Sequence, residues 1–109
     1  MNHPSLKLAA VLSCLMLAPF AAVADDAGLD PIAAAGKVIF EETAGGVGCQ
    51  TCHGPEAKGD VGPDIRGRTS KDILTQLKNN TNMQFIKLTK DEVDQVATYL
   101  LYLHDLEAH

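Results

Sequence analysis

The chain has 109 residues, 46% of them hydrophobic and 21% charged, and its formal net charge is −5. This length allows one small domain and excludes two. The acidic balance gives no electrostatic support for nucleic-acid binding, so we expect no nucleic-acid partner. A domain this short buries a limited core, and such domains often gain stability from a disulfide, a metal or a cofactor.

Residues 1–24 have the pattern of a secretory signal peptide. Lys7 adds positive charge beside the amino terminus, an apolar run extends from Leu8 to Phe20, and the small side chains up to Ala24 fit a cleavage site. We therefore predict export to the periplasm, cleavage after Ala24, and a mature domain at residues 25–109 without a membrane anchor. The mature chain has 8 basic and 14 acidic residues, a net charge of −6.

Two alternatives to simple cleavage remain open. An uncleaved anchor needs roughly 20 apolar residues to span a membrane, whereas this run is interrupted by Pro19 and ends at Phe20. Lipidation at Cys14 is weakly suggested by "VLSC", but apolar and small residues continue past Cys14 as far as Ala24, which suits cleavage there better.

A first helix is predicted to begin at Pro31. Asp30 can cap the free amide groups of the first turn, and proline suits the first helical position. The glycines of "TAGGVG" from Thr43 end the helix. Its expected inward face consists of Ile32, Gly36, Ile39 and Phe40.

Two more helices are predicted further along the chain. One runs from Ser70 to Asn79, and the other reaches Leu106 from a capping box formed by Thr89 and Glu92. The expected inward residues are Ile73, Leu74 and Leu77 in the first of these, and Val93, Val96, Ala97, Leu100 and Leu103 in the second. No stretch alternates polar and apolar residues between hairpin turns, so we predict an all-α fold with about three main helices.

The segment Gly45–Arg68 is rich in Gly, Pro and Asp, and irregular segments this long in a compact domain are usually functional. It contains "CQTCH", in which two residues separate Cys49 from Cys52 and His53 follows at once. This spacing fits covalent haem attachment, because two thiols bond to the two vinyl groups and the next imidazole binds the iron. We predict one haem c, linked through Cys49 and Cys52 and ligated by His53.

Two other interpretations of the cysteines fit less well. A thioredoxin-like dithiol needs a strand–helix context that the sequence does not show, and a structural zinc site needs four ligands. Beyond the motif, the mature chain contains only His104 and His109 as further Cys or His side chains.

Met83 is the only methionine of the mature chain and lies in the polar stretch "TNMQF". A thioether on the far side of the iron would complete its coordination and raise its potential. The alternatives are a methionine that fills a gap in the core and a competing ligand in His104, whose late position in the last helix favours the surface. The carbonyl of Pro63 is a rigid candidate acceptor for the second ring nitrogen of His53, although Gly62-Pro63 could simply mark a turn.

These motifs together resemble the class I cytochromes c, specifically the small bacterial periplasmic carriers with one haem. The resemblance covers nearly all of the mature chain, through "AAGKVIFEE", "CQTCHG", "GDVGPDIRGRTS" and "NMQFIKLTKDEVDQVATYLLYL". It implies that the first and last helices cross, with Gly36 and Phe40 at the crossing point of the first helix. Val96 and Tyr99 are their counterparts on the last helix.

The resemblance also implies roles for single residues. Pro63 accepts a hydrogen bond from His53, Ile65 packs on the haem, and Met83 is the axial thioether. The chain departs from the family pattern at Gln84, where members commonly have proline after the ligand methionine. The glycine-rich stretch before Cys49 is also longer than in minimal members.

The function implied by the resemblance is one-electron transfer between transient redox protein partners. An enzyme is not expected, because iron with His53 and Met83 as axial ligands leaves no position for a substrate. One alternative is a cytochrome subunit bound permanently to a periplasmic dehydrogenase or oxidase. Another is a haem sensor or ligand-binding protein, if Met83 is not an iron ligand.

Charge is unevenly distributed along the mature chain. Residues 25–52 have a net charge of −4, residues 53–90 of +3, and residues 91–109 of −5. If the middle segment surrounds the haem edge, a weakly basic rim there would steer an acidic partner. The alternative is a solvated surface without steering. Arg66 or Arg68 is a candidate partner of a haem propionate.

Overall fold

The computed structural model describes residues 29–108, so the predicted signal peptide lies outside the described residues. In chain order the elements are α1 (Pro31–Val38), the π-helix η2 (Ile39–Thr43), the 3₁₀-helix η3 (Ala44–Gly46), α2 (Gln50–His53), α3 (Ser70–Asn79) and α4 (Lys90–Ala108). The described chain contains no strand, and the fold is all-α as predicted. Of the helices in residues 29–108, none has the length and apolar character needed to cross a membrane.

Helix α1 begins as the sequence predicted. The Asp30 carboxylate accepts hydrogen bonds from the backbone N–H groups of Ile32 and Ala33, both at 2.9 Å, and Pro31 occupies the first helical position. The prediction that Ile32 faces inward is wrong, because its side chain is 54% exposed. The face that packs against α4 is set by Gly36 and Phe40, and Ala33 rather than Ile32 lies on that face.

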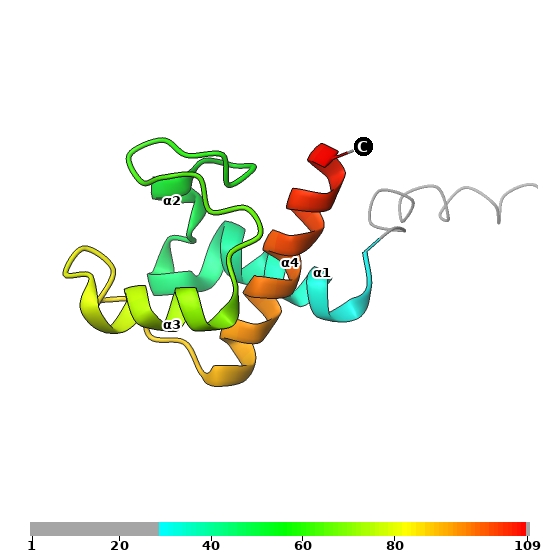
Figure 1. Cartoon of the computed structure of the whole chain (residues 1–109). Helices are drawn as coiled ribbons and strands as arrows, with labels where there is room; N and C mark the ends of the chain where they lie inside the picture. The colour runs from blue at the N-terminus through cyan, green and yellow to red at the C-terminus, as the bar shows by residue number, and fades with distance from the viewer. Residues whose placement is uncertain (1–28, 109) are drawn as a thin grey trace, which may run out of the picture.

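The crossing of α1 and α4 is the main helix–helix contact of the fold (Figure 1). A Cβ at Gly36 would overlap the backbone carbonyl of Gln95, so only glycine allows the two backbones to come this close. Beside this point the rings of Phe40 and Tyr99 pack with their centroids 5.6 Å apart. Val96 is buried in the same core. The crossing implied by the family resemblance is therefore present.

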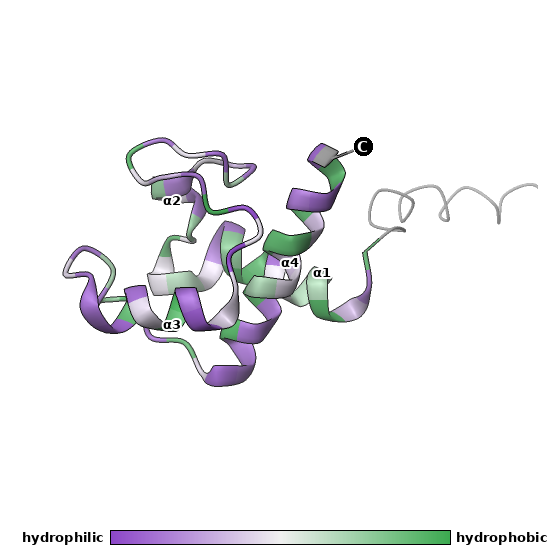
Figure 2. Cartoon of the chain, in the orientation of Figure 1, coloured by the Kyte–Doolittle hydropathy of each residue, from purple (hydrophilic) through white to green (hydrophobic). Residues whose placement is uncertain are grey.

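Helix α4 begins with the predicted capping box. The backbone N–H of Glu92 donates to Oγ1 of Thr89 (3.1 Å), and the Thr89 N–H donates to Oε1 of Glu92 (2.8 Å). The buried residues of this helix are Val93, Val96, Tyr99 and Leu100. Helix α4 carries hydrophilic residues beside these hydrophobic ones, as the colouring of Figure 2 shows.

Helix α3 has the predicted bounds and its own capping box, formed by Thr69 and Asp72. It packs on α4, and the Ser70 hydroxyl donates to Oδ1 of Asp94 at 2.6 Å. Only Ile73 and Leu77 pack partly against the core, so the prediction that Leu74 faces inward is wrong; Leu74 is 40% exposed. Only a narrow face of α3 contacts the core, and Leu74 lies outside this face.

The segment Gly45–Arg68, predicted to be irregular, contains more regular structure than the sequence suggested, whereas the predicted first helix does extend to Thr43. The α-helical turns of α1 widen into η2 and tighten into η3 before the chain reaches Cys49. The motif itself then forms α2, a single helical turn. The irregular part is thus the loop from Gly54 to Arg68, which arcs from α2 to the start of α3 (Figure 1).

Candidate functional site

A cavity of about 750 Å³ lies between α2, α3 and the loop after α3. This volume falls in the range of small-molecule and cofactor sites. All six residues that the sequence analysis assigned to cofactor binding border it: Cys49, Cys52, His53, Pro63, Ile65 and Met83. The fold thus brings together side chains from α2, from the loop Gly54–Arg68 and from the loop after α3.

The other walls of the cavity are mostly apolar. They include Ile73 and Leu77 of α3, Leu100 of α4, and Phe85, Ile86 and Leu88 from the segment between these helices. Sequence reasoning identified Ile73 and Leu77 as inward residues but not as walls of this site. An apolar cavity with a histidine and two cysteines at one wall and a methionine at another fits a large hydrophobic group that carries a metal ion.

Helix α2 explains how the motif presents its three reactive side chains together. The backbone N–H of His53 donates to the carbonyl of Cys49 (3.1 Å), and the Thr51 hydroxyl donates to the carbonyl of Val47 (2.9 Å). In one helical turn, positions i, i+3 and i+4 lie on the same face. Cys49, Cys52 and His53 have this spacing, so all three border the cavity.

The two cysteines have different surroundings. Cys52 is exposed, whereas Cys49 is half-buried, and neither forms a disulfide. Burial raises the pKa of the Cys49 thiol to about 11. Within residues 29–108, no three His, Cys, Asp or Glu side chains form a group that could hold a metal ion by themselves, so the zinc interpretation gains no support there.

The ring of His53 is held by the backbone of the following loop. Its side chain is only 7% exposed, and Nδ1 lies 2.7 Å from the carbonyl oxygen of Pro63. Because a carbonyl can only accept, Nδ1 must carry the proton and donate it. A neutral ring then keeps the lone pair of Nε2, which is available to a metal. The Gly62-Pro63 pair is therefore more than a turn signal.

Gly62 is a site residue that the sequence reasoning missed. A Cβ at this position would lie 2.7 Å from Cε1 of His53. The Gly62 N–H donates to the carbonyl of Cys52 at 2.6 Å, which ties the loop to the end of the motif. Its place directly before Pro63 was the one available signal, but the sequence does not show that an imidazole ring packs against it.

Met83 borders the cavity from the loop after α3 and packs partly against the core. Its N–H donates to the carbonyl of Asn80 (2.9 Å), and its carbonyl accepts from the N–H of Ile86 (3.0 Å). Gln84, which stands where the family commonly has proline, donates from Nε2 to the carbonyl of Lys78 at 2.9 Å. A side-chain hydrogen bond to α3 thus holds the loop at the position where a proline would stiffen it.

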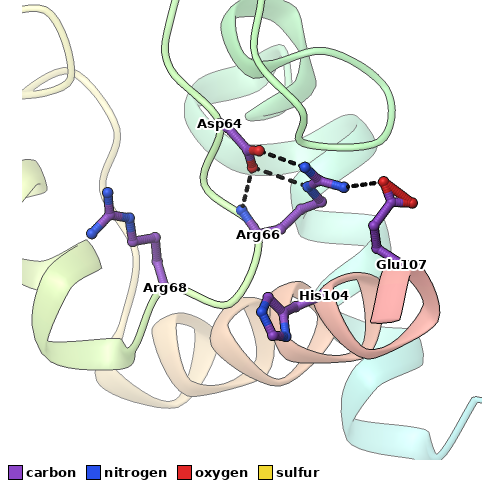
Figure 3. Close-up of a pocket in the computed structure, with 5 residues that line it drawn as sticks. All are labelled: Asp64, Arg66, Arg68, His104 and Glu107. Atoms are coloured by element: carbon purple, nitrogen blue, oxygen red, sulfur yellow. Dashed lines mark hydrogen bonds and ion pairs between the residues drawn. The ribbon is translucent and has the colours of Figure 1, made fainter. Parts of the chain in front are cut away.

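The two arginine candidates for a propionate partner and His104 differ in whether they border the cavity. Arg68 borders the cavity, whereas Arg66 does not. Arg66 lies with Asp64, Glu107 and His104 around a second, open hollow between the loop and α4, and Arg68 borders this hollow as well (Figure 3). Of the two candidates for a propionate partner, Arg68 is the one beside the cavity, and His104 is not among the residues that border it.

Comparison with known families agrees with this arrangement. Residues 33–81 match the family model described as Cytochrome c. The matched range includes most of α1, the motif in α2, the loop with Pro63 and the whole of α3, and it ends shortly before Met83. No curated protein and no solved structure is significantly similar to the chain.

Proposed function

Because this chain belongs to the cytochrome c family and binds haem c covalently, we propose that it carries single electrons in the bacterial periplasm with His53 and Met83 as axial ligands. Haem iron supplies the chemistry, a one-electron change between the ferric and ferrous states. The observation that carries the proposal is that two cysteines, a histidine and a methionine border one apolar cavity.

In this proposal the cysteines of α2 fix the cofactor at one wall of the cavity. Cys49 and Cys52 are three positions apart in a helical turn, so their sulfur atoms lie on the same face. Thioether bonds at these two positions hold the group permanently. A permanent link prevents loss of the cofactor from a small domain and supplies core material that the chain itself lacks.

His53 is the proposed ligand on the α2 side. Its hydrogen bond to Pro63 fixes the tautomer and the orientation of the ring. The same bond increases electron donation from the ring to a metal, because a partly withdrawn Nδ1 proton makes the imidazole more basic. Burial of His53 excludes water from competing at this position.

Met83 is the proposed ligand on the opposite side. A thioether is a weak, uncharged donor that favours the ferrous state and raises the potential. Two side-chain ligands leave no open position for a substrate, which supports an electron carrier over a catalyst. The hydrogen bonds of Met83 and Gln84 to the end of α3 restrict the loop and so support a fixed ligand geometry in both oxidation states.

The proposed location and partners rest on the sequence. Residues 1–24 have the pattern of a signal peptide, and this type of haem attachment takes place after export. The partners are proposed to be transient redox proteins. In the structure Lys58, Arg66 and Lys90 form ion pairs with acidic residues. The remaining candidates for a basic rim are Arg68, Lys87 and the two lysines near the ends of α3, Lys71 and Lys78.

Two measurements test the proposed function. Mass spectrometry of the exported protein should show residues 25–109 with the added mass of one haem. The optical spectrum should show narrow low-spin bands after reduction and a weak long-wavelength band of methionine coordination in the ferric state. Absence of the added mass would contradict haem attachment, and added mass without the weak band would contradict Met83 as ligand.

A further inference from the structure

Arg66 connects the loop that contains Pro63 to the last turn of α4 (Figure 3). Its Nε and Nη2 donate to the two carboxylate oxygens of Asp64, at 3.0 and 2.6 Å. Its Nη1 donates to Oε1 of Glu107 at 2.9 Å. Two nitrogens of the guanidinium group therefore bind Asp64, the residue directly after Pro63, and the third binds Glu107 of α4.

The link to Asp64 acts on the carbonyl that holds His53. The Pro63 carbonyl belongs to the peptide group that joins Pro63 to Asp64, so the placement of Asp64 determines where this oxygen points. The Asp64 carboxylate also accepts from the backbone N–H of Arg66 at 3.0 Å. The Asp64 carboxylate is thus held twice by Arg66, through the backbone N–H and through the guanidinium group.

Backbone hydrogen bonds also hold this loop, in addition to the ion pairs of Arg66. The N–H of Ile65 donates to the carbonyl of Ala57, and the N–H of Gly67 donates to the carbonyl of Leu100, both at 2.9 Å. The first bond lies within the loop, the second ties the loop to α4, and neither involves Asp64. Pro63 has no N–H with which to anchor itself. The Gly62 N–H bond to Cys52 holds the chain before Pro63. After Pro63, the Asp64 side chain and its partner Arg66 hold it.

The cluster is better suited to positioning than to stability. Ion pairs near the surface add little to the free energy of folding, and the side chains of Asp64 and Glu107 are largely exposed. Arg66 differs from them, because its side chain is only 19% exposed and its contact with Asp64 is bidentate. Bidentate pairs fix direction as well as distance. Hydrogen bonds with Arg66 also hold the pKa of both carboxyl groups below their usual range.

We propose that Arg66 is a positioning residue, which through Asp64 and Glu107 holds the Pro63 carbonyl on Nδ1 of His53 and so sets how strongly His53 donates to the iron. This inference rests on the proposed axial role of His53. Hydrogen-bond strength falls steeply with distance and angle, so a small movement of the carbonyl changes the basicity of the ring. A less basic ring stabilises ferric iron less and raises the reduction potential.

Arg66→Lys is the first test, because it keeps the charge and removes the planar fork. The readouts, on the haem-containing protein, are solvent exchange of the His53 Nδ1 proton by NMR in the ferrous state and the reduction potential. We expect exchange to become about tenfold faster. The equilibrium constant for reduction should rise about threefold, which is about 28 mV at 59 mV per decade.

Glu107→Gln tests the contact between Arg66 and α4, with Asp105→Asn as its matched control. Both changes remove one carboxylate from the same end of α4, but Asp105 contacts His104 (3.4 Å) and not Arg66. Asp105→Asn therefore controls for the loss of one negative charge at this end of the helix. We expect faster Nδ1 proton exchange in Glu107→Gln and the unchanged rate in Asp105→Asn.

The outcomes separate this inference from the proposed function. If the unmodified protein shows no histidine coordination, the proposed function fails and the inference fails with it. If its spectrum is that of histidine and methionine ligation but Arg66→Lys and Glu107→Gln exchange like Asp105→Asn, only the inference fails. Far-ultraviolet circular dichroism of each variant establishes that the helices have formed.

Discussion

The carbonyl oxygen of Pro63 lies 2.7 Å from Nδ1 of His53, and Gly62 packs against the same ring. Pro63, ten residues after His53, thus determines which ring nitrogen of His53 carries the proton. The ring itself comes from α2, but its protonation and direction come from the backbone of another segment. This relationship makes the loop Gly54–Arg68 part of the site rather than a connection between helices.

Gly62→Ala should weaken this arrangement. The added Cβ would meet Cε1 of His53 at 2.7 Å and Nδ1 at 2.8 Å, and the buried ring has little room to move. We expect the loop to shift and the free energy of unfolding to fall by about 1–3 kcal/mol. Urea titration of the haem-containing protein measures this free energy. Asp60→Ala is the control, because it truncates an exposed side chain of the same loop; equal losses in both variants would contradict the prediction.

Met83→Ala should remove the proposed axial thioether. We expect the weak long-wavelength band of the ferric protein to disappear, the ferrous protein to bind carbon monoxide at neutral pH, and the potential to fall because the ferrous state loses its preferred ligand. Optical spectroscopy measures all three. Phe85→Ala changes the same loop without removing sulfur and should keep the band. A band that survives in Met83→Ala would show that another group binds the iron.

Gly36→Ala tests the helix crossing. Its Cβ would overlap the Gln95 carbonyl, which is backbone and cannot rotate away, so α1 and α4 must separate. We expect a loss of stability of at least about 2 kcal/mol. Val38→Ala on the same helix removes an exposed side chain and should cost less than about 1 kcal/mol. Thermal and urea unfolding measure the two; a stable Gly36→Ala protein would contradict this close approach.

Acid should destabilise the protein partly through Asp64. Hydrogen bonds from Arg66 lower the pKa of Asp64 to about 2 in the folded protein, below its usual value of about 3.9. A carboxyl group whose folded pKa is depressed contributes stability that is complete above about pH 4 and is lost as the pH falls through the folded pKa. Asp64→Asn should therefore lower stability at neutral pH and flatten its fall below about pH 4.

Urea unfolding at several pH values measures this dependence. The matched control is Asp60→Asn, which removes one carboxylate from the same loop but none of the bonds to Arg66. A pH profile of Asp64→Asn that runs parallel to the profile of the unmodified protein would contradict the assignment.

Charge reversal at the ends of α3 tests the proposed basic rim. Lys71→Glu and Lys78→Glu should lower the rate constant of electron transfer with a small acidic redox protein by roughly 3- to 10-fold at low ionic strength. The difference should nearly vanish at about 0.5 M salt, where surface charges are screened. Stopped-flow kinetics measures the rates, and Lys37→Glu on α1, away from the cavity, is the control. Rates that are independent of salt would exclude steering.

Most of the predictions made from the sequence rest on the spacing of residues that are close together in the chain. The motif from Cys49 to His53 and the capping residues Asp30, Thr89 and Glu92 act within one or two helical turns, so neighbours in the chain suffice to identify them. The bounds of α3 and the start of α4 follow from the same kind of short-range signal. The crossing of α1 and α4 was predicted as well, but only through the family resemblance.

Tertiary contacts decided the rest. Ile32 and Leu74 have the right period for an inward face, yet both are exposed, because only the packing partner determines how wide that face is. Arg66 and Arg68 are equivalent in the sequence, and the fold turns one toward α4 and places the other beside the cavity. The sequence by itself determined the reactive groups. The three-dimensional fold determined their neighbours, because contacts between distant residues depend on how the whole chain packs.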